Sequence, residues 1–148
     1  PLNTINTLID MGASITMAKG AADTGIENAM AIIGDSTFTH SGMTGLLEAI
    51  NDKSAITVII SDNATVAMTG AQESVATGRL KEICLGLGVA PEHLKMMVPL
   101  KKNFDKNLEL IKKEIHYKGV SVIISERPCV RLSRDSKEQI KQKIASLN

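Results

Sequence analysis

Two apolar runs that each end in polar residues decide the fold of this chain: AMAIIGDS at residues 29–36 and ITVIISDN at residues 56–63. Runs of this length, bounded by Gly, Asp, Ser or Asn, are typical of buried β-strands. The stretch between them carries apolar residues at a helical period over residues 43–50. A strand, a helix and a second strand predict a right-handed crossover that joins two parallel strands.

The parallel arrangement predicts that the polar ends of both runs lie at the same edge of the sheet. Asp35 follows the first run, where we expect a polar turn over residues 34–42, and Asn63 follows the second run. Open α/β sheets bind ligands at this carboxyl edge, and Mg²⁺ prefers carboxylate and amide oxygens. Asp35 and Asn63 are therefore candidate metal ligands, with ordinary strand-end turns and caps as the alternative interpretation.

The rest of the chain predicts further elements of one α/β domain. We expect helices at residues 12–22, 77–88, 104–115 and 136–147 and strands at residues 94–98 and 120–124. In the helix at 104–115, Phe104, Leu108, Ile111 and Ile115 form an apolar stripe that we expect to be buried, with Asn103 as its cap. The expected fold class is α/β, with a mostly parallel sheet between two helical layers. Residues 1–148 are expected to form one domain, which the chain enters part-way on its N-terminal side.

Composition excludes several classes of protein. No apolar stretch of this 148-residue chain approaches the ~20 residues that span a bilayer, so we expect no membrane partner. No charged leader precedes an apolar segment, so we expect a cytoplasmic protein. Cys84 and Cys129 lie far apart without a Cys-x-x-Cys spacing, which argues against a disulfide framework, a zinc site or an iron–sulfur cluster within this chain.

The charge distribution is uneven, but it does not indicate nucleic-acid binding. Residues 1–100 contain 5 Lys and Arg against 10 Asp and Glu, whereas residues 101–148 contain 12 against 6. Single-strand binding needs stacking aromatic residues, and the aromatic residues here are Phe38, Phe104 and Tyr117. Solvated outer helix faces explain the basic part of the chain, and docking of an acidic partner is the alternative.

Four blocks of the sequence resemble the thiamine diphosphate-dependent 2-oxoacid:ferredoxin oxidoreductases of the indolepyruvate type. The blocks are DMGASI at residues 10–15, GDSTFTHSG at 34–42, SDNATVAMTGAQ at 61–72 and VIISERPC at 122–129. They occur in the family's order, and the resemblance that they carry extends over most of the chain. The resemblance implies the thiamine diphosphate-binding fold, and specifically the domain that holds the diphosphate end of the cofactor.

The resemblance also implies a magnesium site and a contact with the organic half of the cofactor. Asp35, Asn63 and the main-chain carbonyl of Thr65 would hold the Mg²⁺ ion. Met11, followed by Gly12, stands where thiamine enzymes place the apolar wedge that bends the cofactor. A methionine that fills the hydrophobic core is the alternative interpretation of Met11.

Further residues are implied to contact the cofactor: Gly34, Ser36, Thr37, His40, Met68 and Thr69. Ser36 stands where many thiamine enzymes have glycine, a departure that matches the indolepyruvate-type family. Small residues after Asn63 would let the backbone approach a ligand closely. His40 could donate a hydrogen bond to phosphate or serve the reacting centre, and a purely structural loop histidine is the alternative.

The implied reaction is oxidative decarboxylation of a 2-oxoacid, an aryl pyruvate, to acyl-coenzyme A with electrons passed to ferredoxin. We expect no catalytic residue in this chain, because the family places the activating glutamate on a separate pyrimidine-binding domain or subunit. Iron–sulfur clusters are expected on a ferredoxin-like domain or a beta subunit, and a homodimer is one arrangement that the resemblance allows. The alternatives are a fragment of a non-oxidative thiamine decarboxylase or synthase, and a non-catalytic scaffold domain of the same fold.

Overall fold

The computed structural model describes residues 5–64 and 75–129, together with residues 138 and 142. The implied site residues Thr65, Met68 and Thr69 lie outside the described residues, as does most of the helix expected at 136–147.

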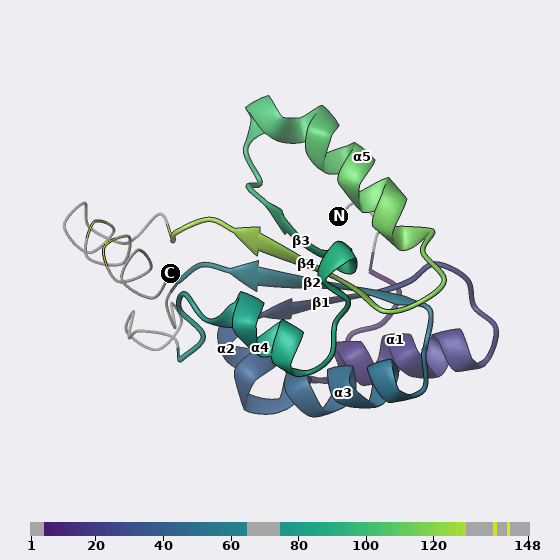
Figure 1. Ribbon diagram of the computed structural model, residues 1–148. Helices are drawn as coiled ribbons and strands as arrows, with labels where there is room; N and C mark the ends of the chain where they lie inside the picture. The colour runs from purple at the N-terminus through teal and green to yellow at the C-terminus, as the bar shows by residue number, and fades with distance from the viewer. Residues whose placement is uncertain (1–4, 65–74, 130–137, 139–141, 143–148) are drawn as a thin grey trace.

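A four-stranded parallel sheet forms the centre of the domain (Figure 1). Its strands, in the order β1-β2-β4-β3, are β1 (Ala29–Gly34), β2 (Ile56–Asp62), β4 (Ser121–Glu126) and β3 (Leu94–Met97). β1 pairs with β2, which pairs with β4 on its other side, and every pairing is parallel. The structure therefore confirms the βαβ unit expected from the two apolar runs.

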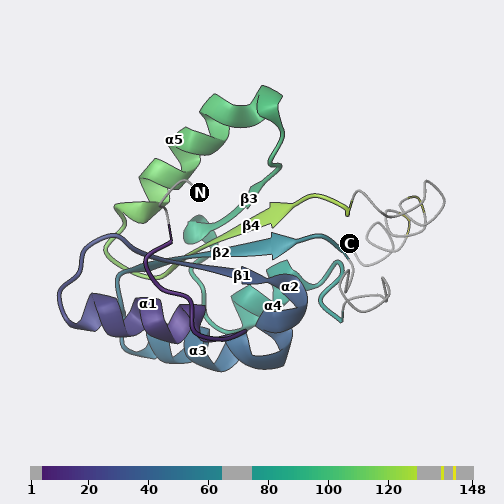
Figure 2. The ribbon, with the colours of Figure 1, turned by 180° about the vertical axis from the view of Figure 1, so that it is seen from behind.

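Helices cover both faces of the sheet, as expected (Figures 1 and 2). On one face lie α1 (Ser14–Asp23), α3 (Met43–Asn51) and α4 (Leu80–Gly86), and on the other lies α5 (Phe104–Ile115). Short 3-10 turns, η3 (Pro91–His93) and η4 (Lys101–Asn103), precede β3 and α5. Within the described residues, no helix has the length and apolar character needed to cross a membrane.

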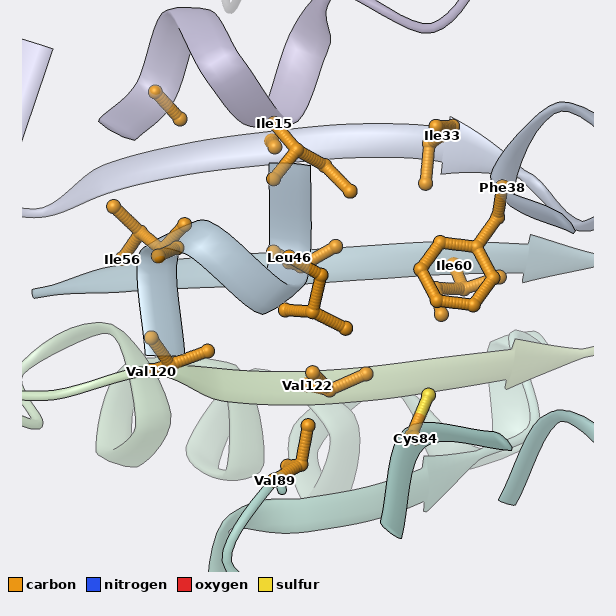
Figure 3. Close-up of a cluster of buried hydrophobic side chains, with 14 of the residues drawn as sticks. Ile15, Ile33, Phe38, Leu46, Ile56, Ile60, Cys84, Val89, Val120 and Val122 are labelled. Carbon is orange, nitrogen blue, oxygen red and sulfur yellow. The ribbon is translucent and has the colours of Figure 1, made fainter. Parts of the chain in front are cut away.

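The hydrophobic core fills the space between the sheet and the face that carries three helices (Figure 3). Alternate residues of β1, β2 and β4 point into it, including Ile33, Ile60 and Val122. Leu46 of α3 and Cys84 of α4 pack against them from the helical layer. Burial raises the pKa of the Cys84 thiol to about 12, so this side chain is a neutral core residue.

The opposite face of the sheet is covered unevenly. Ile59 of β2 and Ile123 of β4 are buried on the side of α5. Met30 and Ile32 of β1 point to the same side, yet their exposed fractions are 42% and 59%. Because β1 is apolar on both faces, its sequence suits a strand that is covered on both sides.

Helix α5 begins and ends as expected, but its apolar stripe is only partly buried, because Ile111 and Ile115 are half-buried and the two residues nearer its start are exposed. Phe104 is 63% exposed and Leu108 is 37% exposed, because the first turns of α5 rise away from the sheet (Figure 1). The predicted capping bond is also absent: the Asn103 side chain donates to the carbonyl of Val98 at 3.2 Å. The buried residue of α5 is Glu114, near its C-terminal end.

Candidate functional site

The carboxyl edge of the sheet brings the two candidate ligand segments to neighbouring strands. Gly34, the last residue of β1, is paired with Ser61 of β2. Asp35 is therefore one residue beyond this pair, directly after β1. Asn63 is two residues beyond the pair, directly after β2. Both residues lie at the same edge, as the spacing of the two apolar runs predicted.

A helix begins at Asp35, where we expected a polar turn. Helix α2 (Asp35–Thr37) continues into the π-helical segment η1 (Phe38–Gly42) and then into α3. Hydroxyl groups donate back to carbonyls along this stretch: Thr39 Oγ1 to Ser36 at 3.1 Å, and Ser41 Oγ to Thr37 at 3.3 Å. The hydroxyl groups that could have favoured a turn are thus bonded within the helical stretch. The amide-rich start of the helix lies at the edge of the sheet, and helix starts of this kind bind anions.

Two buried carboxylates lie close together at this edge. Asp35 is 3% exposed and Asp62 is 8% exposed. Burial raises the pKa of Asp62 to about 6, and the negative charges of Asp35 and Glu126 raise it further against the lowering effect of the Ala64 amide. A cation bound at this edge would offset the repulsion, so the set of oxygen donors fits a divalent metal ion.

The loop after β2 is held by its own turn and by the chain that follows β4. The amide of Ala64 donates to Asp62 Oδ1 at 2.8 Å, and Ala64 itself adopts φ 60°. The amide of Arg127 donates to the Asp62 carbonyl at 2.9 Å, and the amide of Cys129 donates to the Asn63 carbonyl at 3.1 Å. The VIISERPC block therefore fixes the main chain of Asn63.

Open space lies above Gly34. A Cβ atom at this position would have no neighbour within 4 Å among the described residues, and the backbone angles of φ −76° and ψ 152° suit any residue. Neither packing nor conformation requires glycine here. The open space next to Asp35 is of the kind that a ligand could occupy.

The Met11–Gly12 turn packs against the helix that begins at Asp35. Gly12 adopts φ 102°, and a Cβ atom there would collide with Ser41 Oγ and lie 3.8 Å from Thr37 Cγ2. Met11 is 76% exposed, so the alternative interpretation of this methionine as a core residue is wrong. His40 lies in η1 and is exposed.

Acidic side chains at the ends of β2 and β4 and on α4 also line a cavity of about 160 Å³. Asp62, Glu82 and Glu126 contribute three carboxylates, whereas Lys81 contributes an ammonium group. This excess of negative charge suits a cation better than a bare anion. Sequence reasoning did not assign Asp62 and Glu126 a role. A signal was nevertheless present, because both residues stand at the carboxyl ends of buried strands, as Asp35 does.

The described site residues fall into three segments that meet at one edge: residues 11–12, 34–40 and 63. In residues 5–64 and 75–129, no group of three or more His, Cys, Asp and Glu side chains is arranged to hold a metal ion. A metal ion here would thus also need amide, carbonyl, water or ligand oxygens, which is how Mg²⁺ commonly binds.

Similarity to known proteins agrees with this geometry. The chain is 32% identical over 143 residues to indolepyruvate oxidoreductase subunit IorA of Archaeoglobus fulgidus, covering 89% of this chain and 22% of that protein. It is also 32% identical over 167 residues to the IorA subunit of Pyrococcus horikoshii, covering 93% of this chain and 25% of that protein. The chain thus spans about a quarter of the length of these relatives.

Solved structures share the fold at lower sequence identity. A 2-oxoglutarate:ferredoxin oxidoreductase from Magnetococcus marinus has a TM-score of 0.63 at 15% identity, covering 89% of this chain and 50% of that chain. A putative thiamin diphosphate-dependent enzyme from Mycobacterium smegmatis has a TM-score of 0.58 at 19% identity, covering 81% of this chain and 22% of that chain. Residues 1–124 match the family model described as thiamine pyrophosphate enzyme, C-terminal TPP binding domain. This chain belongs to that family of thiamine pyrophosphate-binding domains.

Proposed function

We propose that this chain is the diphosphate-binding domain of an indolepyruvate-type 2-oxoacid:ferredoxin oxidoreductase. The relationship to IorA subunits supports this choice within the family. In this proposal residues 1–148 form one domain that works together with a pyrimidine-binding domain, a ferredoxin-like domain and a beta subunit. The substrates would be an aryl pyruvate and coenzyme A, with ferredoxin as the electron acceptor.

The observation that carries the proposal is the meeting of Asp35 and Asn63 at one edge of the sheet. In the proposed site, the Asp35 carboxylate and the Asn63 amide would hold Mg²⁺ together with the carbonyl of Thr65. The start of the helix at Asp35 and the open space above Gly34 would receive the diphosphate.

The chain's own part in the reaction is to bind and to orient. When bound, thiamine diphosphate supplies the electron sink for decarboxylation of a 2-oxoacid. Asp35 would fix the diphosphate end through the metal, while the exposed Met11 would limit the positions open to the organic half. Ser36, Thr37 and His40 lie on the same helical stretch and would donate to the diphosphate, with Met68 and Thr69 beyond Asn63 on the substrate side.

Titration calorimetry with Mg²⁺ and thiamine diphosphate tests the anchor. The Asp35→Asn variant should bind at least about tenfold more weakly than the wild type, because a metal ligand loses its charge. The matched control is Asp105→Asn, since Asp105 lies in the first turn of α5 and is exposed. Equal affinities of the wild type and Asp35→Asn would remove the proposed metal site.

Co-purification tests the wider assignment. A partner that carries iron–sulfur clusters and a pyrimidine-binding glutamate would support the oxidoreductase. A partner without either, combined with no binding of thiamine diphosphate, would favour the scaffold interpretation. A partner with the glutamate but without iron–sulfur clusters would favour the non-oxidative decarboxylase or synthase.

A further inference from the structure

The turn formed by Met11 and Gly12 has a specific support on the candidate site helix. The position of a Cβ atom on Gly12 is occupied by the Ser41 hydroxyl, and the Ser41 Cβ would be only 3.2 Å from it. Gly12 also adopts φ 102°, a conformation that L side chains rarely adopt. The backbone of the turn can approach the helix this closely only because residue 12 has no side chain.

Ser41 is itself fixed in place. Its Oγ donates to the Thr37 carbonyl at 3.3 Å, within the π-helical segment that follows Asp35. Ser41 comes six residues after Asp35, which corresponds to about 9 Å along a helix. The support for the turn therefore belongs to the same continuous helical stretch that begins at the proposed metal ligand.

The contact between Gly12 and Ser41 would fix the position of Met11. Its side chain is 76% exposed although methionine is apolar, and it neighbours the supported glycine in the chain. An exposed apolar side chain next to a turn that contacts the proposed diphosphate-binding helix suits a ligand with an anionic end and an apolar end. Pyrophosphate has the first end alone, whereas thiamine diphosphate has both.

We propose that Ser41 is a positioning residue, which supports the Gly12 turn and thereby holds Met11 against the organic half of bound thiamine diphosphate. This inference rests on the proposed function, because it takes the Asp35 edge as the diphosphate site. Ser41 itself does not touch the cofactor in the proposed complex. It acts through Gly12.

Calorimetry of two probes, Mg²⁺ with thiamine diphosphate and Mg²⁺ with inorganic pyrophosphate, separates positioning from folding. Ser41→Leu should displace the Gly12 turn, weaken thiamine diphosphate at least about fivefold and leave pyrophosphate within about twofold. Thr44→Leu is the matched control, because Thr44 is exposed, lies about one turn further on and donates to the Ser41 carbonyl at 3.3 Å. This control should change neither affinity.

A double-variant cycle tests whether Ser41 acts through Met11. Met11→Ala should weaken thiamine diphosphate and spare pyrophosphate, and Ser41→Leu should cause no further loss in the Met11→Ala background. The inference is overturned if Ser41→Leu loses equal affinity for both probes, or loses affinity for neither. It is also overturned if the losses in affinity for thiamine diphosphate from Ser41→Leu and Met11→Ala are fully additive.

A readout without cofactor keeps this inference distinct from the proposed function. The methyl NMR signal of Met11, assigned with Met11→Leu, should shift in Ser41→Leu and stay unchanged in Thr44→Leu. An unchanged Met11 signal in Ser41→Leu overturns the inference even if both probes bind. If pyrophosphate binding does not depend on Asp35, the proposed function fails, and the role of Ser41 toward the cofactor fails with it.

Discussion

At the scale of single residues, Asp62 shows how close packing of acids shapes the candidate site. This carboxylate is buried, accepts a hydrogen bond from the Ala64 amide and lies near the charges of Asp35 and Glu126. Its pKa is raised from 3.8 to about 6, mainly by burial. The folded state therefore holds the Asp62 proton more tightly than the unfolded chain does.

The raised pKa gives Asp62 a predictable effect on stability. Since the folded pKa lies above the unfolded value, ionisation of Asp62 lowers the free energy of unfolding as the pH rises from about 4 to about 6. Asp62→Asn removes this ionisation and keeps an oxygen acceptor for Ala64. In metal-free buffer the variant should be about 1 kcal/mol more stable than the wild type at pH 7.5, and equally stable at pH 4.

Urea unfolding at the two pH values measures this difference. Asp105→Asn is the control, because it removes an exposed carboxylate and should give no pH-dependent gain. If Asp62→Asn raises the free energy of unfolding by the same amount at pH 4 and pH 7.5, the ionisation of Asp62 is not the cause of the gain.

Gly34 gives a test that separates binding from folding. Gly34→Ala should leave the free energy of unfolding within about 0.5 kcal/mol of the wild type, because its backbone angles are ordinary and no described atom lies within 4 Å of the added Cβ. It should weaken Mg²⁺–pyrophosphate binding at least about fivefold if the open space receives the diphosphate.

Gly20→Ala is the matched control for Gly34→Ala. A Cβ on Gly20 also has no described neighbour within 4 Å, but Gly20 lies on α1, away from the sheet edge. The control should gain about 0.5–1 kcal/mol of stability through helix propensity and bind pyrophosphate unchanged. Unchanged binding in Gly34→Ala would show that the space above Gly34 is not part of the site.

The sequence predicted much of the candidate site at the residue scale because strand ends are visible in it. Asp35 and Asn63 follow apolar runs, and parallel pairing then places them at one edge. The contact between Gly12 and Ser41 could not be predicted, since it depends on a left-handed backbone angle and on the exact rotation of a π-helical turn. Residues 65–74 lie outside the described part, so the metal carbonyl of Thr65 stays a prediction.

At the scale of elements, a buried polar cluster joins α5 to the sheet. Glu114 is 1% exposed, and its Oε2 lies 3.0 Å from Nδ1 of His93, whose ring stacks on Tyr117 at 3.4 Å between centroids. Thr57 of β2 donates to the Glu114 carbonyl at 3.2 Å, and Ser121 of β4 donates to Thr57 at 3.0 Å. These bonds fasten the C-terminal end of α5 to the starts of two strands.

Removal of His93 should therefore destabilise the whole domain. His93→Ala leaves the Glu114 carboxylate buried without its partner, and we expect a loss of about 2–3 kcal/mol in the free energy of unfolding. Glu114→Gln combined with His93→Ala should recover part of this loss, because an amide is less costly to bury than a charge. Chemical denaturation at pH 7 measures both.

His116→Ala is the control for this prediction. His116 follows α5 directly, is exposed, and contacts the Lys112 carbonyl through Nδ1 at 2.6 Å. Its removal should change the free energy of unfolding by less than about 0.5 kcal/mol. A similar small effect for His93→Ala would show that the buried pair contributes little to stability.

Element boundaries were predictable where one periodicity dominates, and less so where two compete. The strands β1, β2 and β4 follow from apolar runs in the sequence, and the pairing of the strands confirms them. The helix starting at Asp35 was hidden, because Gly, Asp, Ser and Thr normally indicate turns. The stripe on α5 was correctly assigned to a helix, but periodicity does not reveal that its first turns tilt away from the sheet.

At the scale of the whole molecule, the two faces of the sheet are covered to different extents. Three helices cover the core face of β1, β2 and β4, whereas on the other face α5 covers β2 and β4 but leaves Met30 and Ile32 of β1 exposed (Figures 1 and 2). β1 is also an edge strand of the described sheet. An exposed apolar edge of this kind favours self-association of the isolated domain.

Two neighbouring residues of β1 test this asymmetry. Ile32→Lys should change the free energy of unfolding by less than about 0.5 kcal/mol and reduce self-association, because Ile32 is 59% exposed. Ile33→Lys should lose more than about 3 kcal/mol, because Ile33 is 5% exposed and faces the core. Light scattering over a range of concentrations, together with thermal unfolding, measures both. Equal destabilisation would mean that the face of β1 carrying Ile32 is covered in solution.

The strand order also sets the sequence in which the domain can assemble while it is being synthesised. β1 and β2 can pair as soon as β2 has followed α3 out of the ribosome, but β3 pairs with β4, which is synthesised only after α5. Until then β3 has no neighbour in the described sheet to hydrogen-bond. Translation that stops before β4 would release a chain whose half-built sheet exposes a backbone edge, the kind of intermediate that chaperones bind.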